Sequence, residues 1–280
     1  MLDVDRVRAA LPRQGLGEPF EFHRSLGSTN DRAAQLARAG GPEGALVLAE
    51  EQTAGRGRGG SPWMTPPGSA LAFSLVLRPR GLSGEAVSGL AAIGALAVAE
   101  ALEAQGAPAR IKWPNDVLLE GRKVAGVLVE AAWAGADLEH AILGIGVNVR
   151  RASVPPDSQA AFPATCVEAA VGRSVEREAV LLGVLDGLGR WIARLGSLDL
   201  QAAWEQRLAF RKEEVRVWDP EGGLAFEGVL IGLLPDGRLR LLTPQGREAH
   251  IRPEGVHLRP AAGPGSALVT GPAAARAGGL

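Results

Sequence analysis

Apolar runs of different lengths alternate with polar or glycine- and proline-rich segments along this chain, and they predict both helices and strands. The longest run, from about Ser83 to Gln105, is rich in Ala and Leu and has the length of a helix. Further helices are expected at 31–38, 175–194 and 200–209. The first of these follows Ser28-Thr29-Asn30, which is typical of a helix N-cap, and stops before Gly40-Gly41-Pro42.

Shorter apolar runs bounded by turn signals predict strands. They lie at 45–50, 71–77, 110–113, 117–119, 124–131 and 141–149. Gly121 separates two of these runs and indicates a hairpin. Residues 151–163 are rich in Pro and Ser and have a length typical of a mobile cover over a substrate.

The pattern changes after Glu213, where short alternating runs are separated by closely spaced turn signals. These signals are Asp219-Pro220, Pro235-Asp236-Gly237 and Pro244-Gln245-Gly246. Four or five short strands in so few residues describe a small barrel-like domain. We therefore expect a first domain at 1–212, a small β domain at 213–261, and a disordered tail at 262–280, which is Ala-, Gly- and Pro-rich without periodicity.

Composition restricts the class of protein. The net charge of −1 argues against wholesale binding of a nucleic-acid backbone, which requires a basic face. The lone Cys166 rules out an intramolecular disulfide and suits a reducing cytoplasm. The most apolar stretch, 91–104, contains Glu100 and Glu103 and is too short to span a bilayer. We expect a soluble cytoplasmic protein of one large and one small domain.

Lysine is the first residue type that suggests chemistry. The chain has three lysines against 27 arginines, and two of the three, Lys112 and Lys123, lie eleven residues apart. Lysine is a compact point charge that approaches a single oxygen closely, whereas arginine is a planar fork. Two lysines in one segment are therefore candidates for a reaction on a carboxylate and a phosphate, although a solvated surface lysine is the common alternative.

A glycine- and arginine-rich loop, 52–60, follows directly on a predicted strand. Glycines allow backbone N–H groups to curl around anionic oxygens, and Arg56 and Arg58 supply charge and bidentate hydrogen bonds. The loop is neither a Walker loop nor a dinucleotide fingerprint, because the required spacing is absent. A loop of this kind is also compatible with a plain flexible surface.

The motifs become specific when they are taken together. In chain order they are Gly27-Ser28-Thr29-Asn30, Glu50 through Arg58, Lys112-Trp113-Pro114-Asn115-Asp116, Arg122 through Glu130, and Gly144-Ile145-Gly146-Val147-Asn148-Val149. This series closely resembles the biotin protein ligases, over residues 22–150 through motifs and over 213–260 through the small β domain. The resemblance implies an α+β fold: a mixed, mainly antiparallel sheet with helices packed on one face, like the catalytic domain of class II aminoacyl-tRNA synthetases, followed by an SH3-like β-barrel.

The resemblance also implies an activity. Biotin and ATP give biotinyl-5′-AMP, and a lysine of a biotin carboxyl carrier protein then takes the biotinyl group. Lys123 would lie between the biotin carboxylate and the α-phosphate, and Arg58 would hold the adenylate phosphate. Asp116 would orient the acceptor ammonium and help to remove its proton. Lys112 would contact phosphates or position Asp116.

Two sets of binding residues follow from the same resemblance. The biotin-binding set is Ser28, Thr29, Asn30, Gln52, Arg56, Gly57, Arg58 and Lys123. The set for ATP and the adenylate is Gly55, Arg56, Gly57, Arg58, Trp63, Asn115, Lys123 and Asn148. Hydroxyl and amide groups suit the ureido ring of biotin, which needs donors and acceptors. Mg²⁺ is expected with ATP, and sequence does not locate its few protein ligands.

Several of these residues have structural alternatives. Ser28 or Thr29 could cap the helix at 31–38, and Asn148 could hold a turn. Trp113 is better explained by packing than by ligand contact. One departure concerns Gly59-Gly60-Ser61-Pro62, where family members often carry basic residues. Other groups, such as Arg252 or Arg259, would then hold the β,γ-phosphates.

Two other functions remain open. A lipoate or octanoyl ligase shares the fold but would carry Arg-Arg followed by several glycines and a His-Asp pair, which do not occur here. A non-catalytic small-molecule- or nucleic-acid-binding module would not need Lys123 and Asp116. About 20 residues precede the motifs, too few for a helix-turn-helix domain, so we expect no operator DNA binding and no membrane partner. The resemblance is also compatible with a homodimer.

Overall fold

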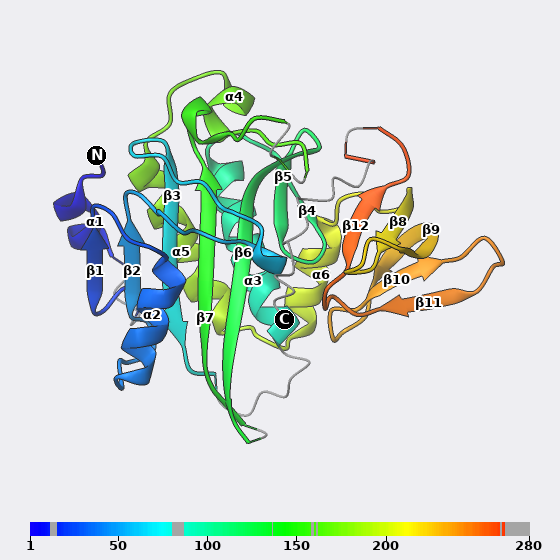
Figure 1. The fold of residues 1–280 in the computed structure, drawn as a ribbon, viewed down its shortest axis with the longest axis horizontal. Coiled ribbons are helices and arrows are strands. Elements are labelled where there is room, and N and C mark those ends of the chain that lie inside the picture. Colours follow the sequence, from blue (N-terminus) through cyan, green and yellow to red (C-terminus); the bar gives the residue numbers. More distant parts are fainter. Residues whose placement is uncertain are drawn as a thin grey trace, which may run out of the picture.

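The structure is a computed structural model that describes residues 1–11, 16–79, 87–135, 137–157, 160, 162–263 and 265–266. These residues form a seven-stranded sheet with helices and a separate five-stranded sheet (Figure 1). The elements of the larger part are α1 (Val4–Ala10), β1 (Phe20–His23), α2 (Thr29–Arg38), β2 (Leu46–Ala49), η1 (Arg58–Gly60), β3 (Ala70–Leu77), α3 (Val87–Ala104), β4 (Ala109–Lys112), β5 (Asp116–Leu119), β6 (Arg122–Ala134), β7 (Asp137–Asn148), η3 (Arg151–Ser153), α4 (Val167–Val171), α5 (Arg177–Ile192) and α6 (Leu198–Gln206). Those of the smaller part are β8 (Glu214–Trp218), β9 (Leu224–Leu233), β10 (Leu239–Leu242), β11 (Glu248–Ile251) and β12 (His257–Pro260).

The larger sheet has the strand order β1-β2-β3-β7-β6-β5-β4. Strands β1 and β2 pair in parallel, and the other neighbouring pairs are antiparallel. The expectation of a mixed, mainly antiparallel sheet is therefore confirmed. The long hairpin of β6 and β7 forms its centre, and it places the predicted motif residues of both strands side by side.

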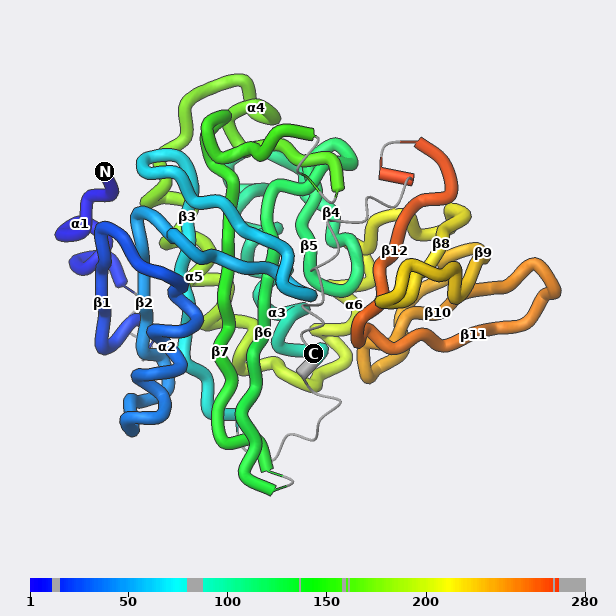
Figure 2. Tube along the Cα trace, viewed as in Figure 1, coloured from blue at the N-terminus to red at the C-terminus, as the bar shows by residue number. Residues whose placement is uncertain are grey.

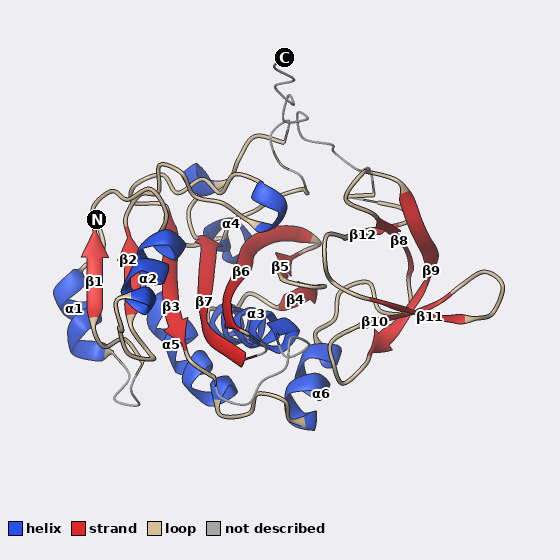
Figure 3. Cartoon of the chain, turned by 60° about the horizontal axis from the view of Figure 1, so that its bottom comes forward, coloured by secondary structure: helices blue, strands red, loops and turns tan. Residues whose placement is uncertain are grey.

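The alternation of side chains along the strands gives the sheet two covered faces. Leu75 and Leu77 of β3 belong to the main core with α3 and α5, whereas Val76 between them packs with Ala33 and Ala37 of α2. Figure 3 shows α3 and α5 on one side of the sheet and α2 on the other. The helices therefore do not all pack on one face, which corrects the expectation from the sequence.

The segment between β2 and β3 crosses the α2 side of the sheet toward β6 and β5 (Figure 2). It includes the glycine- and arginine-rich loop. Its tip is folded on itself, because Gly57 donates a backbone hydrogen bond to Ser61 and Trp63 donates one to Gly55. The fold therefore carries this loop over β6, which bears Lys123 and Gly126, and β7, which bears Gly146.

The smaller sheet, with the strand order β11-β10-β9-β8-β12, lies beside the β4 edge of the larger one (Figure 3). The buried Trp113, which follows β4, donates its indole N–H to the carbonyl of Gly237 over 2.9 Å. Packing, and not ligand contact, therefore accounts for Trp113. This docking brings β12 close to the Lys112 and Asp116 hairpin.

Several expected elements are present with shifted ends. Some elements of the structure were not predicted from the sequence. The helix predicted from Ser83 is seen as α3 from Val87, and residues 80–86 lie outside the described residues. Most of the predicted tail, 267–280 and residue 264, also lies outside them. The sequence pattern did not predict α1, β1 or α4. The domain limits at 212 and 261 stay predictions.

Candidate active site

The two lysines predicted to carry chemistry meet on one carboxylate. Lys112 ends β4, Asp116 begins β5 directly opposite it, and Lys123 lies near the start of β6. Lys123 Nζ is 2.6 Å from Asp116 Oδ1, and Lys112 Nζ is 3.0 Å from Asp116 Oδ2. Lys112 and Asp116 are buried, whereas the side chain of Lys123 is 26% exposed. Lys123 is thus the member of this triad best placed to meet a ligand.

Burial and mutual attraction set the charge states of the triad. Burial alone would raise the pKa of Asp116, but Lys112 and Lys123 outweigh it and hold that pKa well below its usual range. Burial lowers the pKa of Lys112 to about 8, against the opposing attraction of Asp116. Asp116 is consequently a firmly ionised anchor for two cations.

The two arginines of the loop point to different partners. Arg56 binds Asp31 at the start of α2 and Glu130 on β6, with its Nη2 2.6 Å from Asp31 Oδ1 and 3.0 Å from Glu130 Oε1. Arg58 instead donates to the backbone carbonyls of Pro253 and Val256 in the smaller part. Burial lowers the pKa of Arg58. The loop is therefore held on both of its sides.

A floor of glycines lies under the loop on β6 and β7. Gly126 and Gly146 are direct partners across the two strands, and the indole of Trp63 covers Gly146 so closely that a Cβ there would be 2.3 Å from the ring. Lys123 Nζ lies 5.5 Å from the centre of the Trp63 ring. A Cβ on Gly144 would lie 2.0 Å from Asn30 Oδ1. A larger residue at position 144 would displace Asn30, and one at position 146 would displace Trp63.

The residues expected to bind biotin gather at the start of α2. Ser28 occupies the N-cap position but makes no capping hydrogen bond with its side chain. The side chain of Gln52 supplies that bond instead, since its Oε1 accepts from Thr29 N at 2.8 Å and Thr29 Oγ1 at 3.0 Å. Ser28, Thr29 and Asn30 are all buried. The expected helix-capping role of Ser28 or Thr29 is therefore wrong for both side chains.

Two residues predicted to bind the adenylate donate side-chain hydrogen bonds to backbone carbonyls. Asn115 donates its amide to the carbonyl of Val127 at 2.6 Å, and Asn148 donates to Thr165 at 3.2 Å. Asn148 thus holds the segment that precedes α4, and its expected role toward the adenylate stays a prediction. Both side chains brace strands that carry the glycine floor.

Sequence reasoning missed several residues that the fold brings here. Ser74 is the polar member of the otherwise apolar strand β3, and this interruption is a signal that could have marked it. Two cations contact the ring of Phe162, with Lys112 Nζ 5.0 Å and Arg259 Cζ 5.2 Å from its centre. The pKa of His257 is lowered by burial and then by Arg58, among other cations. The smaller part therefore contributes β12 to the site.

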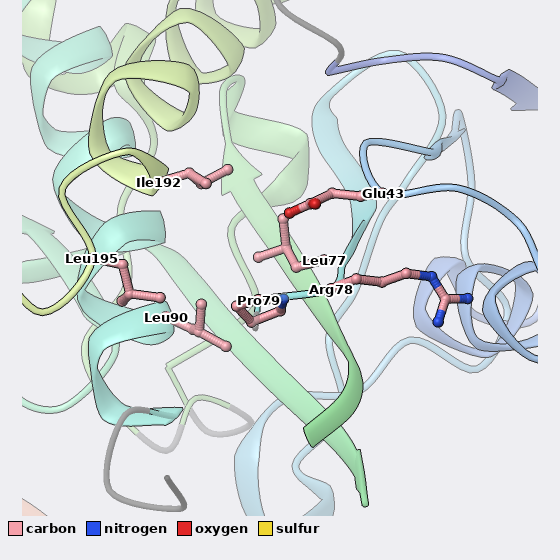
Figure 4. Close-up of a pocket in the computed structure, with 7 residues that line it drawn as sticks. All are labelled: Glu43, Leu77, Arg78, Pro79, Leu90, Ile192 and Leu195. Carbon is pink, nitrogen blue, oxygen red and sulfur yellow. The ribbon is translucent and has the colours of Figure 1, made fainter. Parts of the chain in front are cut away.

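A cavity of about 390 Å³ lies elsewhere, at the end of β3 on the α3 side of the sheet (Figure 4). Its lining residues are Glu43, Leu77, Arg78, Pro79, Leu90, Ile192 and Leu195. None of the residues expected to bind biotin or ATP is among them. Within the described residues, no helix is long and apolar enough to cross a membrane.

Comparisons with known proteins agree with this arrangement. The model of the Biotin/lipoate A/B protein ligase family matches residues 22–148. The biotin–[acetyl-CoA-carboxylase] ligase of Paracoccus denitrificans is 39% identical over 79% of this chain and 93% of its own length. The bifunctional ligase/repressor BirA of Bacillus subtilis is 31% identical over 88% of this chain and 76% of its own.

A solved structure extends the likeness to the fold. The biotin protein ligase from Aquifex aeolicus in complex with biotin and ATP superimposes with a TM-score of 0.71 at 30% identity, over 85% of this chain and 97% of that one. The fold and the site thus define a protein ligase with a class II synthetase-like catalytic part and an SH3-like part. Within that class, the chain belongs to the biotin protein ligase family.

Proposed function

We propose that this chain activates biotin with ATP as biotinyl-5′-AMP and then transfers the biotinyl group to a lysine of a biotin carboxyl carrier protein. The observation that carries the proposal is the Lys112–Asp116–Lys123 triad beneath the glycine- and arginine-rich loop. A half-buried ammonium beside a floor of glycines suits a ligand that is flat at one end and anionic at the other.

In the first step, a biotin carboxylate oxygen attacks the α-phosphorus of ATP, and the bond from that phosphorus to the bridging oxygen breaks to release pyrophosphate. Two anions must approach each other, so a cation between them lowers the barrier. Lys123 takes this role because its ammonium is partly exposed and is held by Asp116 at 2.6 Å. Lys112, which is charged mainly below a pH of about 8, adds a second positive charge behind it.

The neutral end of biotin meets the hydroxyl and amide groups at the start of α2. Ser28, Thr29 and Gln52 offer donors and acceptors to the ureido ring, and Asn30 lies directly over Gly144. Trp63 covers the same floor from the loop. The adenylate would lie between this floor and the loop held by Arg56 and Arg58.

In the second step, the amine of the acceptor lysine attacks the acyl carbon, the bond from that carbon to the phosphate oxygen breaks, and AMP and one proton leave. The two lysines make Asp116 a weak base, because they hold its pKa well below the usual range. Asp116 therefore orients the incoming lysine by attracting its ammonium, which passes a proton to water before the neutral amine attacks, and proton removal is not assigned to Asp116. This revises the role expected from the sequence.

Mg²⁺ accompanies ATP in this proposal. Among the residues that the structure describes, no group of three or more His, Cys, Asp and Glu side chains could hold a metal ion. The ion would therefore be coordinated mainly by phosphate oxygens and water, as is usual for Mg²⁺. Lys112 and the buried Arg259, which both contact the ring of Phe162, are the cations we assign to the β,γ-phosphates.

The acceptor is identified only by class. Relatives are biotin–[acetyl-CoA-carboxylase] ligases, which supports a carrier domain of a carboxylase as the partner. We also propose the cytoplasm as the compartment, since the reaction consumes ATP. The homodimer and the absence of operator binding stay predictions.

The test is a direct assay of the acyl-adenylate. The purified chain is incubated with ATP, Mg²⁺ and either biotin or lipoate, and acyl-AMP is detected by mass spectrometry. Formation of biotinyl-AMP from biotin, without formation of lipoyl-AMP from lipoate, supports the proposal. Lipoyl-AMP formed in preference would assign the chain to the lipoate branch of the same family, and no adenylate with either acid would reject both.

A further inference from the structure

A ring of close polar side-chain contacts joins the biotin end of the site to the loop. Its members, in order, are Gln52, Thr29, Ser74, Asn30, Glu130 and Arg56. The first and last members, Gln52 and Arg56, both belong to the segment between β2 and β3, so the backbone of that segment closes the ring. The hydroxyl of Ser74 carries one proton and donates either to Thr29 or to Asn30, not to both at once. Ser74 and Glu130 are the two members that were not expected from the sequence.

The orientation of Asn30 is fixed from two sides. The hydroxyl of the fully buried Ser74 lies 2.6 Å from Asn30 Oδ1, and Asn30 Nδ2 donates to Glu130 Oε2 at 2.7 Å. Asn30 itself is 4% exposed and rests against the position where a Cβ of Gly144 would stand. Its amide therefore cannot turn without breaking a bond on one side or the other.

Glu130 connects this amide to the loop. Its other oxygen, Oε1, accepts from Arg56 Nε at 3.2 Å and from Arg56 Nη2 at 3.0 Å. Three separate elements thus meet on one carboxylate: the first turn of α2, strand β6 and the loop. Arg56 keeps a second anchor, Asp31, at 2.6 Å. A change at Glu130 is consequently expected to loosen the loop without releasing it.

We propose that Glu130 is a positioning residue for biotin, which orients the Asn30 amide and ties it to Arg56 so that the wall of the biotin site and the loop over it move as one body. The inference rests on the proposed function. Glu130 does not touch the reacting atoms in this account, since it acts through Asn30 and Arg56. Its removal should therefore affect binding of biotin far more than the rate at saturation.

The test exchanges the amide and the carboxylate of the Asn30–Glu130 hydrogen bond. In Glu130→Gln the charge opposite Arg56 is lost, and because the side chain is 39% exposed we expect only about a five- to tenfold rise in the KM for biotin. In Asn30→Asp two carboxylates face each other, and we expect the KM to rise about 100-fold. In the double variant the amide introduced on β6 can donate to the carboxylate introduced on α2, so the KM should return to about that of Glu130→Gln.

The readouts separate positioning from folding. The kcat of Glu130→Gln should stay within about twofold of the wild-type value, and its melting temperature should be unchanged. Glu139→Gln is the matched control, because Glu139 is a half-exposed carboxylate on the neighbouring strand β7, away from the ring. That variant should keep the wild-type KM for biotin.

Two results would overturn the inference while leaving the proposed function intact: an unchanged KM for biotin in Glu130→Gln, or a double variant no better than Asn30→Asp. Both are measured against a wild-type protein that forms biotinyl-AMP. A wild-type protein that forms none would instead reject the proposed function, and the inference with it.

Discussion

Lys123 Nζ lies 2.6 Å from Asp116 Oδ1, and the same carboxylate holds Lys112 Nζ at 3.0 Å through its second oxygen. One buried anion thus keeps two ammonium groups together at a place where they would otherwise repel each other. The net charge of the triad is positive as long as Lys112 is protonated. A cationic site of this kind is suited to a reaction between a carboxylate and a phosphate.

The first prediction concerns pH. The ammonium of Lys112 has a pKa lowered by burial to about 8, so its charge is present below that pH and lost above it. The rate of biotinyl-AMP formation should therefore fall as the pH rises through about 8, by roughly tenfold per unit if the charge is required. Lys112→Arg should remove this limb, because arginine stays charged. Single-turnover adenylation across a pH range of about 7 to 10 measures it.

The titration of Lys112 does not itself destabilise the fold as the pH rises. Between about 8 and its usual value of 10.5, Lys112 binds more protons in the unfolded chain than in the folded one, so this group favours the folded state increasingly as the pH rises. A melting temperature that drops in step with the rate would speak against the role of Lys112. A flat rate profile in the wild-type protein would do the same.

A second prediction concerns retention of the intermediate. Arg58 ties the loop to the carbonyls of Pro253 and Val256, and Arg58→Gly removes that tie together with the charge near the adenylate. The variant should release biotinyl-AMP into solution and label lysines of unrelated proteins. Free adenylate in a filtrate and biotin on added serum albumin are the two measurements. Retention equal to that of the wild-type protein would refute this role.

A third prediction concerns stability. Glu50 and Arg177 form a buried ion pair at 2.9 Å, and Glu50 also accepts from Leu2 N at 3.0 Å and Gly68 N at 2.6 Å. Arg177→Met leaves the carboxylate buried without its cation, which should cost about 3–5 kcal/mol in the free energy of unfolding. Arg190→Met on the same helix, whose ion pairs are exposed, should cost less than about 1 kcal/mol.

The same pair gives a pH dependence of known sign. Burial raises the pKa of Glu50, but Leu2 N, Arg177 and Gly68 N outweigh it and lower the pKa below the usual value. Its contribution to stability is therefore complete above the ordinary carboxyl pKa and is lost as the pH falls through the lowered one. Urea titrations of wild type and Arg177→Met should converge in acid. Equal unfolding free energies at neutral pH would contradict the account.

Elements with long, uninterrupted patterns could be predicted from the sequence. The buried strand β3, the helix α3 and the β5–β6 hairpin with its turn at Gly121 all have an apolar period or a turn residue within the element itself. By contrast, β1 has four residues and is held by parallel pairing with β2, and β12 contains Pro260 and pairs with β8. Their stability depends on partners distant in the sequence.

The residues of the site fall into the same two groups, those predictable from local sequence and those that depend on distant partners. Lys112, Asp116 and Lys123 lie in two motifs that are close together in the sequence, so their proximity could be foreseen, although the pairing of Lys123 with Asp116 was not. The ring through Ser74 and Glu130 depends on which residues of β3 and β6 face α2, and on the register between strands, which local sequence does not determine. The destination of Arg58 depends on how the smaller part docks, which is likewise invisible in the loop itself.

The central claim is that the ammonium of Lys123 compensates the charge of the carboxylate and the α-phosphate during adenylation. Replacing Lys123 by Ala should slow single-turnover formation of biotinyl-AMP by about 10²–10³-fold, as the loss of an oxyanion donor does. The exposed Lys212, the third lysine of the chain, provides the control, since Lys212→Ala should keep the wild-type rate. A folded Lys123→Ala protein that forms the adenylate as fast as the wild type would contradict the account.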